Sequence, residues 1–200
     1  MAAYEPMVNH VPAGNAGDIC VRHREVTPEE SQISRLRTLM TGESSTPPGT
    51  YCQLYVRGTL MMSDVPFEQK TNREFVRRAR GDVLLAGLGI GMVLVPVLNK
   101  PEVSSVTVIE KYRGVIELVQ PYVAHPKLDV QLADIFEWQP PKGQSWDTLY
   151  FDIWSNITTD SLREITKLKR KFARRKKPGG WMGAWLEDHL RALKRRGRWR

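Results

Sequence analysis

The chain has 200 residues, 41% of them hydrophobic and 8% aromatic, which is enough for one globular domain with its own core. Its two cysteines lack metal-ligand spacing, and neither a signal peptide nor an apolar run of about 18 residues is present, so we expect a cytoplasmic protein with free thiols, no metal site and no membrane span. The net charge of +8 combines −4 over residues 1–166 with +12 over residues 167–200, which suggests a polyanionic partner unless the basic residues only form a solvated face.

The first 74 residues are expected to form an N-terminal part with an arm, a helix and a β-hairpin. Residues 1–20 have no periodicity and indicate an extended or partly disordered arm. Thr27, Pro28 and Glu30 have the spacing of a capping box at a helix start. The apolar residues of this helix share one face: Ile33, Leu36, Leu39 and Met40.

A hairpin is predicted after a loop rich in serine and proline at residues 42–49. Two apolar, β-prone stretches between Tyr51 and Met62 flank Arg57 and Gly58, which is typical of two paired strands. Residues 63–66 end the hairpin.

Residues 75–200 are expected to form a Rossmann-like domain with a basic C-terminal tail. The predicted strands cover residues 83–87, 104–110, 128–132, 146–152 and 181–185. The predicted helices cover residues 72–80, 91–99, 112–122, 160–176 and 186–195. Strands that alternate with helices in this way indicate an α/β fold with a mostly parallel sheet covered on both faces.

A glycine turn follows the first strand of this domain. The apolar run at residues 83–86 is followed by Gly87, Gly89 and Gly91 and then by a stretch of helical length. Strand, glycine turn and helix together are typical of the first unit of a nucleotide-binding fold. Side chains at these glycines would keep a ligand away from the backbone.

Acidic residues stand at or just beyond the ends of three later strands. Glu110 closes the second strand 19 residues after Gly91, where a carboxylate can accept both hydroxyls of a ribose. Asp134 follows the third strand, where it or the Ile135 amide could meet an adenine edge, and Asp152 closes the fourth. One such acid alone is more often a helix cap. Three in succession, at the edge where α/β sheets bind ligands, indicate a nucleoside-type ligand.

Four segments resemble the consecutive motifs of class I S-adenosylmethionine-dependent methyltransferases, over about residues 75–190: residues 86–91, 108–110, 133–135 and 150–152. The resemblance implies S-adenosylmethionine as the cofactor, with the glycine turn near its methionine part. It also implies that Glu110 binds the ribose hydroxyls and that Asp134 and Ile135 border the adenine. NAD enzymes use a similar acid at the position of Glu110, but the segment at 133–135 favours the S-adenosyl group.

Within that superfamily the chain is most similar to spermidine synthases, because of the predicted hairpin, residues 63–68, and Glu110 and Lys111 before an apolar helix. It also resembles short methyltransferase-like proteins of phages and bacteria, which share the segments at 62–64 and 152–154. Neither resemblance implies a substrate.

Several residues depart from the aminopropyl-transferase pattern, and these departures bear on the choice of substrate. Aminopropyl transferases carry two acids in an Asp-x-x-Asp pattern, and here Asp152 matches the first whereas Ser155 replaces the second. Arg57 and Met61 stand where that family has Asp and Gln. A polycationic substrate needs several carboxylates, so these changes argue against polyamines.

The motifs of nucleobase methyltransferases are also incomplete. Amino methyltransferases usually carry two prolines and an aromatic residue after the fourth strand; this chain has Trp154 but neither proline. Cytosine C5 chemistry needs a cysteine nucleophile, and neither Cys20 nor Cys52 lies in such a context.

The sequence therefore predicts a methyltransferase with an unknown acceptor. Asp152 could orient an amine or hydroxyl and accept its proton, although it could instead contact the cofactor or cap the following helix. Trp154 could form a substrate wall or simply pack. The alternatives are an aminopropyl transferase and a nucleic-acid-binding accessory protein with a vestigial cofactor site.

Two basic runs and the end of the sheet suggest partners. The runs from Lys167 to Lys177 and from Arg191 to Arg200, which includes Trp199, could bind nucleic acid. After the fifth predicted strand the chain has no room for the terminal antiparallel hairpin of a complete class I sheet. We therefore expect a shortened sheet whose edge is covered by the N-terminal segment or by a second subunit in a homodimer.

Overall fold

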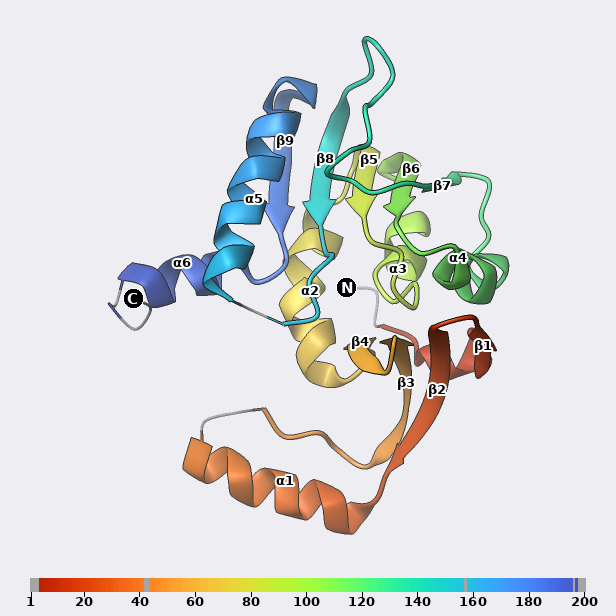
Figure 1. The fold of residues 1–200 in the computed structure, drawn as a ribbon, viewed down its shortest axis with the longest axis vertical. Helices are drawn as coiled ribbons and strands as arrows, with labels where there is room; N and C mark the ends of the chain where they lie inside the picture. The colour runs from red at the N-terminus through yellow and green to blue at the C-terminus, as the bar shows by residue number, and fades with distance from the viewer. Residues whose placement is uncertain (1–3, 42–43, 157, 196, 198–200) are drawn as a thin grey trace.

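A computed structural model describes residues 4–41, 44–156, 158–195 and 197, and Figure 1 shows them as two β-sheets with helices around them. In chain order the structure contains η1 (Met7–Asn9, a 3-10 helix), β1 (Gly14–Ala16), β2 (Ile19–Val26), α1 (Pro28–Thr41), β3 (Gly49–Val56), β4 (Thr59–Ser63), α2 (Pro66–Arg78), β5 (Gly81–Ala86), α3 (Leu94–Leu98), β6 (Val103–Glu110), α4 (Arg113–Val119), η2 (Gln120–Tyr122), β7 (Leu128–Leu132), β8 (Trp146–Phe151), α5 (Thr159–Phe172), η3 (Ala173–Arg175), β9 (Lys176–Ala184) and α6 (Glu187–Arg195).

The larger sheet has five parallel strands in the order β7-β6-β5-β8-β9. This confirms the predicted α/β, Rossmann-like fold with a parallel sheet. From β5 the chain builds outward through β6 and β7, and it then returns to the other side of β5 for β8 and β9. Open α/β sheets bind ligands at the carboxyl ends of the strands beside such a reversal.

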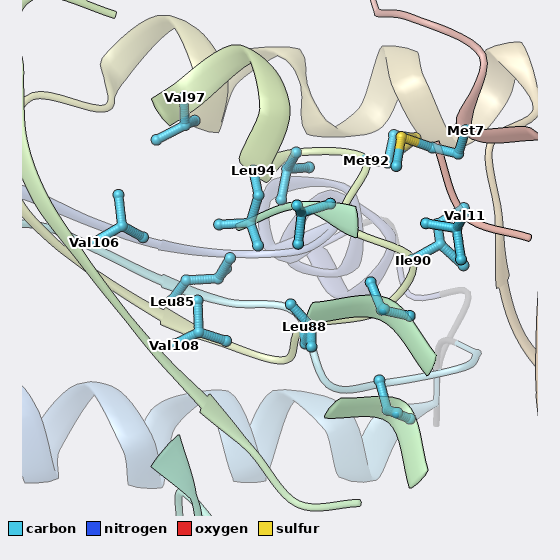
Figure 2. Packing of buried hydrophobic residues seen from close by; sticks show 14 of the residues in the cluster. Met7, Val11, Leu85, Leu88, Ile90, Met92, Leu94, Val97, Val106 and Val108 are labelled. Carbon is cyan, nitrogen blue, oxygen red and sulfur yellow. The ribbon is translucent and has the colours of Figure 1, made fainter. Parts of the chain in front are cut away.

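β5 is the central strand and is buried on both faces. Val83 and Leu85 belong to one hydrophobic core with α2, α3 and α4, whereas Leu84 and Ala86 belong to a second core with α5 and α6. Because successive strand residues point to opposite faces, a strand that is covered twice needs a continuous apolar run. Figure 2 shows the first of these cores, with side chains from the N-terminal segment, β5, β6 and α3.

The N-terminal part forms a second sheet, which is antiparallel and has the order β1-β2-β3-β4. The predicted hairpin is confirmed as β3 and β4, joined by Arg57 and Gly58 with φ angles of 50° and 76°. Two-residue turns with two positive φ angles match the twist of paired strands. The prediction did not include β1 and β2, so the hairpin is one half of a larger sheet.

Residues 1–20, expected to form an extended or partly disordered arm, are ordered wherever the structure describes them. Met7 and Val11 are only 1% and 0% exposed. Figure 2 places both beside Ile90 and Met92 of the segment that follows β5. The arm is therefore held by a few apolar anchors, which produce no periodic pattern in the sequence.

Asp64, at the corner between β4 and α2, fixes this segment by hydrogen bonds. Its Oδ2 atom accepts a bond of 2.7 Å from the Met7 backbone N–H, and its Oδ1 atom accepts one of 2.8 Å from the Cys52 N–H of β3. The predicted boundary between residues 74 and 75 falls inside α2, and the first core takes side chains from both sides of it. The division into two parts stays a prediction.

The predicted start of α1 is confirmed, but its apolar face is not covered in the described structure. Thr27 Oγ1 accepts from the Glu30 N–H, and Glu30 Oε2 accepts from the Thr27 N–H, both at 3.2 Å. Ile33 and Leu36 are 53% and 59% exposed. The side chains of Leu39 and Met40 lie outside the described residues.

Two other elements begin earlier than predicted. α2 starts at Pro66 rather than at residue 72, since proline is favourable in the first helical turn. β9 starts at Lys176 and takes in Pro178, Gly179 and Gly180, which the sequence suggested as a break. β9 tolerates them because its register with β8 is irregular there and proline is accepted in an edge strand.

In the described part of the chain β9 pairs only with β8, and α6 follows it. The predicted shortened sheet therefore has an open edge at β9, whereas the homodimer stays a prediction. None of the described helices has the length and apolar character needed to cross a bilayer.

We expect Asp64→Ala to lower the free energy of unfolding by about 2–4 kcal/mol, because two buried N–H groups lose their acceptor. Urea denaturation followed by circular dichroism measures this. Asp18→Ala removes an exposed acid paired with Arg57 and should change the free energy by less than about 0.5 kcal/mol. Equal effects of the two substitutions would contradict the anchoring role of Asp64.

Candidate functional site

A pocket of about 220 Å³ lies at the carboxyl ends of β5, β6 and β8, and β3 and β4 of the N-terminal sheet close one side of it. Six of the seven predicted site residues line it: Gly87, Gly89, Glu110, Asp134, Ile135 and Asp152. Gly91 lies outside this lining, and a Cβ atom there would come within 2.7 Å of a Val123 methyl group. The structure thus brings together residues from four separate segments, and it gives Gly91 a packing role.

Glu110 is the most deeply fixed acid of the site. Its side chain is buried beneath the glycine turn, where Oε2 accepts from the Leu88 N–H and Oε1 from the Tyr112 N–H, each at 2.8 Å. Burial raises the pKa of Glu110, although backbone hydrogen bonds to Leu88, Tyr112 and Lys111 oppose that rise. A carboxylate has about four acceptor positions, so these bonds leave capacity for hydroxyl donors.

Asp134 lines the same pocket, and its carboxylate is bonded to neighbouring residues. Oδ1 accepts from the Phe136 N–H at 2.9 Å, and Oδ2 is 2.9 Å from Lys111 Nζ. Burial raises the pKa of Asp134, but the bonds from Lys111 and Phe136 outweigh it and hold the pKa below its ordinary value. Asp134 is therefore a charged, oriented acid beside the apolar side chains of Ile135 and Phe136.

Asp152 follows β8 directly, and its backbone N–H donates to the Ala86 carbonyl at 2.9 Å. Burial raises the pKa of Asp152 to about 7. Glu68, in the first turns of α2, lies close enough to feel this charge. Burial, and then the charge of Asp152, raise the pKa of Glu68 to about 8.

The glycines at positions 87 and 89 have positive φ angles and lie against neighbouring atoms, a backbone oxygen for Gly87 and a side chain for Gly89. A Cβ atom on Gly87, whose φ is 96°, would collide with the Asp152 carbonyl oxygen. A Cβ atom on Gly89, whose φ is 53°, would collide with the Met62 sulfur, which also lies 3.3 Å from the Ile90 nitrogen. The turn therefore packs against β8 on one side and against the N-terminal sheet on the other.

Several site residues were missed in the sequence. Met62 of β4 and Lys111 and Tyr112 after β6 line the pocket, and Glu68 lies within range of the Asp152 charge. Lys111 directly follows Glu110, so its position at the end of the same strand could have predicted that it belongs to the site. Nothing in the sequence relates Glu68 or Met62 to Asp152, because their proximity depends on how the two sheets pack.

Three residues that bear on the choice of substrate lie in different parts of the structure. Trp154 lines the pocket and donates from Nε1 to Glu164 Oε2 at 2.6 Å. It therefore both forms part of the pocket wall and packs against a neighbouring residue. Arg57 sits at the tip of the hairpin, exposed and 3.3 Å from Asp18, and neither it nor Ser155 is among the lining residues. The positive charge of Arg57 is therefore no argument against a cationic substrate.

Most of the basic run from Lys167 to Lys177 is used inside the protein. Five of its eight cations bond to the protein: Lys169 to Glu187, Lys171 to the Ile135 and Phe136 carbonyls, Arg175 to the Pro141 and Gln144 carbonyls, Lys176 to the Gly180 carbonyl, and Lys177 to Asp82 and Asp147. Lys167 lies over the Phe136 ring, and Arg170 and Arg174 are exposed.

The second basic run is described only in part. Arg191 pairs with Glu187, and Trp199 and Arg200 lie outside the described residues. Lys194 and Arg195 are exposed, and nucleic-acid binding stays a prediction. No group of three or more His, Cys, Asp or Glu side chains among the described residues could hold a metal ion.

Solved structures share the fold. An N-methyltransferase, NodS from Bradyrhizobium japonicum WM9, aligns with a TM-score of 0.47 at 16% identity, covering 60% of this chain and 67% of that one. The spermidine synthase from Thermotoga maritima aligns with a TM-score of 0.50 at 18% identity, covering 66% of this chain and 48% of that one. No protein-family model and no curated protein sequence matches the chain.

The second of these structures is of a kind that the sequence motifs resemble, a spermidine synthase. The chain spans about half the length of the spermidine synthase. At 18% identity this similarity establishes the fold alone.

We expect Asp152→Asn to lower the pKa of Glu68 from about 8 toward its ordinary value, because the neighbouring negative charge is removed. Carbon-13 NMR of labelled carboxyl groups measures this, with Asp134→Asn as the control that leaves Glu68 unchanged. A Glu68 pKa that does not respond to Asp152→Asn would show that the two acids are not neighbours.

The same shift predicts how stability depends on pH. The pKa of Glu68 is raised from 4.5 to about 8 by folding, so its contribution to the free energy of unfolding is complete below pH 4.5 and is lost as pH rises through 8. Glu68→Gln should flatten this part of the curve of urea stability against pH. An unchanged slope in the variant would contradict the shift.

Proposed function

We propose that the protein is an S-adenosylmethionine-dependent methyltransferase. The observation that carries the proposal is a single pocket that joins a buried carboxylate, Glu110, to a second acid, Asp152, across the backbone of the glycine turn. Glu110 can accept the two hydroxyls of a ribose, and Asp152 lies where a sulfonium and a methyl acceptor would meet.

The lining suits the parts of this cofactor. Ile109, Ile135 and Phe136 offer apolar surface for an adenine, and the Ile135 N–H and the oriented Asp134 could meet its polar edge. The volume of about 220 Å³ is below the roughly 300 Å³ where ligand pockets usually begin. Met62, whose sulfur lies against Gly89, is a flexible side chain in the pocket wall that can turn aside to enlarge it.

S-adenosylmethionine would supply an activated methyl group on a sulfonium centre. The work of the protein is then to hold the acceptor in line and to exclude water. Asp152 can orient the acceptor and take its proton, and a pKa of about 7 is well matched to a general base at neutral pH. Trp154, held by Glu164, closes the pocket on the same side.

Two other functions remain to be separated from this one by experiment. An aminopropyl transferase would use the same pocket with decarboxylated S-adenosylmethionine. A nucleic-acid-binding accessory protein would have no measurable affinity for the cofactor, and it would depend on the exposed cations of the basic runs.

We expect isothermal titration calorimetry to show binding of S-adenosylmethionine and S-adenosylhomocysteine, and weaker binding of decarboxylated S-adenosylmethionine. Glu110→Ala should reduce the affinity at least 100-fold, because two ribose hydrogen bonds to a buried carboxylate are lost, each contributing about 1.5–3 kcal/mol. The matched control is Glu117→Ala, an exposed acid on α4. Tighter binding of the decarboxylated form would favour aminopropyl transfer, and no binding of any form would overturn the proposal.

A further inference from the structure

The strand order of the larger sheet determines which part of a ligand would lie over the glycine turn. Asp134 follows β7, Glu110 ends β6, the turn follows β5 and Asp152 follows β8, and these four strands are neighbours in that order. An elongated ligand with its base beside Asp134 and its ribose on Glu110 therefore lays its next part over the turn. In S-adenosylmethionine that part is the sulfur with its amino-acid chain.

The side chain of Met62 already lies on this part of the turn. Its sulfur fills the space that a Cβ atom on Gly89 would take, and its terminal methyl carbon would lie 3.3 Å from that Cβ position. The Ile90 N–H donates to the same sulfur over a distance of 3.3 Å. The space that glycine opens at position 89 is therefore filled by a side chain of the N-terminal sheet.

A β-bulge turns this side chain toward the pocket. Leu54 of β3 pairs with Met62, and Tyr55 pairs with Leu60, so Met61 is an extra residue between the two pairs. Successive strand residues normally point to opposite faces, yet Met61 and Met62 both line the pocket. Bulges re-aim side chains in this way and are frequent beside functional sites. Two unbranched, flexible thioethers thus form this part of the wall.

The Ile90 N–H is a buried donor with a weak acceptor. Ile90 is 0% exposed, and within the described part of the chain the Met62 sulfur is the one acceptor of its N–H. The neighbouring Leu88 N–H, by contrast, bonds to the Glu110 carboxylate at 2.8 Å. Thioether sulfur accepts only weakly, and a buried N–H without a good partner is costly. An oxygen atom of a ligand would be a better partner, so its hydrogen bond would offset the displacement of Met62.

We propose that Met62 is a gate that holds the place of the cofactor's amino-acid part over the glycine turn. The inference rests on the proposed function, since it concerns how the same pocket admits that cofactor. On binding, the Met62 side chain turns away from Gly89 and frees the Ile90 N–H for an oxygen of the ligand, and no covalent bond changes. Met62 is thereby a specificity-determining residue, because a ligand with the base and ribose but no amino-acid part leaves it in place.

Calorimetric titration of the full chain with two matched ligands tests the gate. S-adenosylhomocysteine and 5′-methylthioadenosine share the purine, the ribose and a thioether, and only the first carries the amino-acid part. We expect Met62→Ala to tighten binding of S-adenosylhomocysteine about five-fold and to change binding of 5′-methylthioadenosine less than about two-fold, since only the first ligand displaces the thioether. Leu60→Ala, an exposed position of the same strand outside the pocket lining, should change neither affinity.

The outcomes separate the gate from the proposed function. Equal tightening of both ligands, no change for either, or weaker binding of S-adenosylhomocysteine would overturn the gate alone, because the pocket would still bind an S-adenosyl group. Binding of neither ligand, by the natural chain or by Met62→Ala, would overturn the proposed function and the gate together. Binding of S-adenosylhomocysteine by Met62→Ala but not by the natural chain would support both.

A second measurement follows the Met62 side chain directly in the natural chain. Carbon-13 NMR of the methionine methyl groups reports its position, with Met62→Leu used to assign the signal. We expect S-adenosylhomocysteine to shift the Met62 methyl signal and the Ile90 amide signal, and 5′-methylthioadenosine to leave both near their free positions. Equal shifts with the two ligands would contradict the gate, even if Met62→Ala were too unstable to titrate.

Discussion

The contact between Gly87 and the backbone carbonyl of Asp152 sets the geometry on which the site depends. A Cβ atom at Gly87 would collide with that carbonyl oxygen, so the ends of β5 and β8 approach as closely as backbones allow. This contact brings the glycine turn next to Asp152, while the Leu88 N–H in the same turn reaches across to Glu110. The glycine is thus explained first by the packing of the protein, and its suitability for a ligand follows from that packing.

The second sheet completes the site. β3 and β4 contribute pocket walls, Met62 rests on Gly89, and the N-terminal segment inserts Met7 and Val11 into the core above β5. A parallel sheet alone would leave the carboxyl ends of its strands open to water. Here β3 and β4 close one side of them, and partial exclusion of water from such a site strengthens electrostatic interactions with a bound ligand.

Sequence patterns predicted the elements whose signal is local. The central strand β5 is a continuous apolar run at residues 83–86, and the acids at the strand ends meet because parallel strands end at one edge. β2 escaped prediction because four consecutive residues from Arg22 to Glu25 are exposed, which hides the strand period. Glu68 could not be related to Asp152, since only the packing of the two sheets brings them together. The internal role of Lys171 could not be predicted, because its acceptors, the Ile135 and Phe136 carbonyls, are backbone groups that are the same in every sequence.

The internal use of those lysines makes the protein sensitive to acylation. Lys171 donates to the Ile135 and Phe136 carbonyls, in the loop that borders the pocket. Lys177 links Asp82 to Asp147 at the N-terminal ends of β5 and β8, away from the pocket. An acetyl group on either amine removes its charge and two of its donors, and leaves the partners unsatisfied. Acetylation of Lys171 would thus act on the pocket from outside it, through a residue that does not line the pocket.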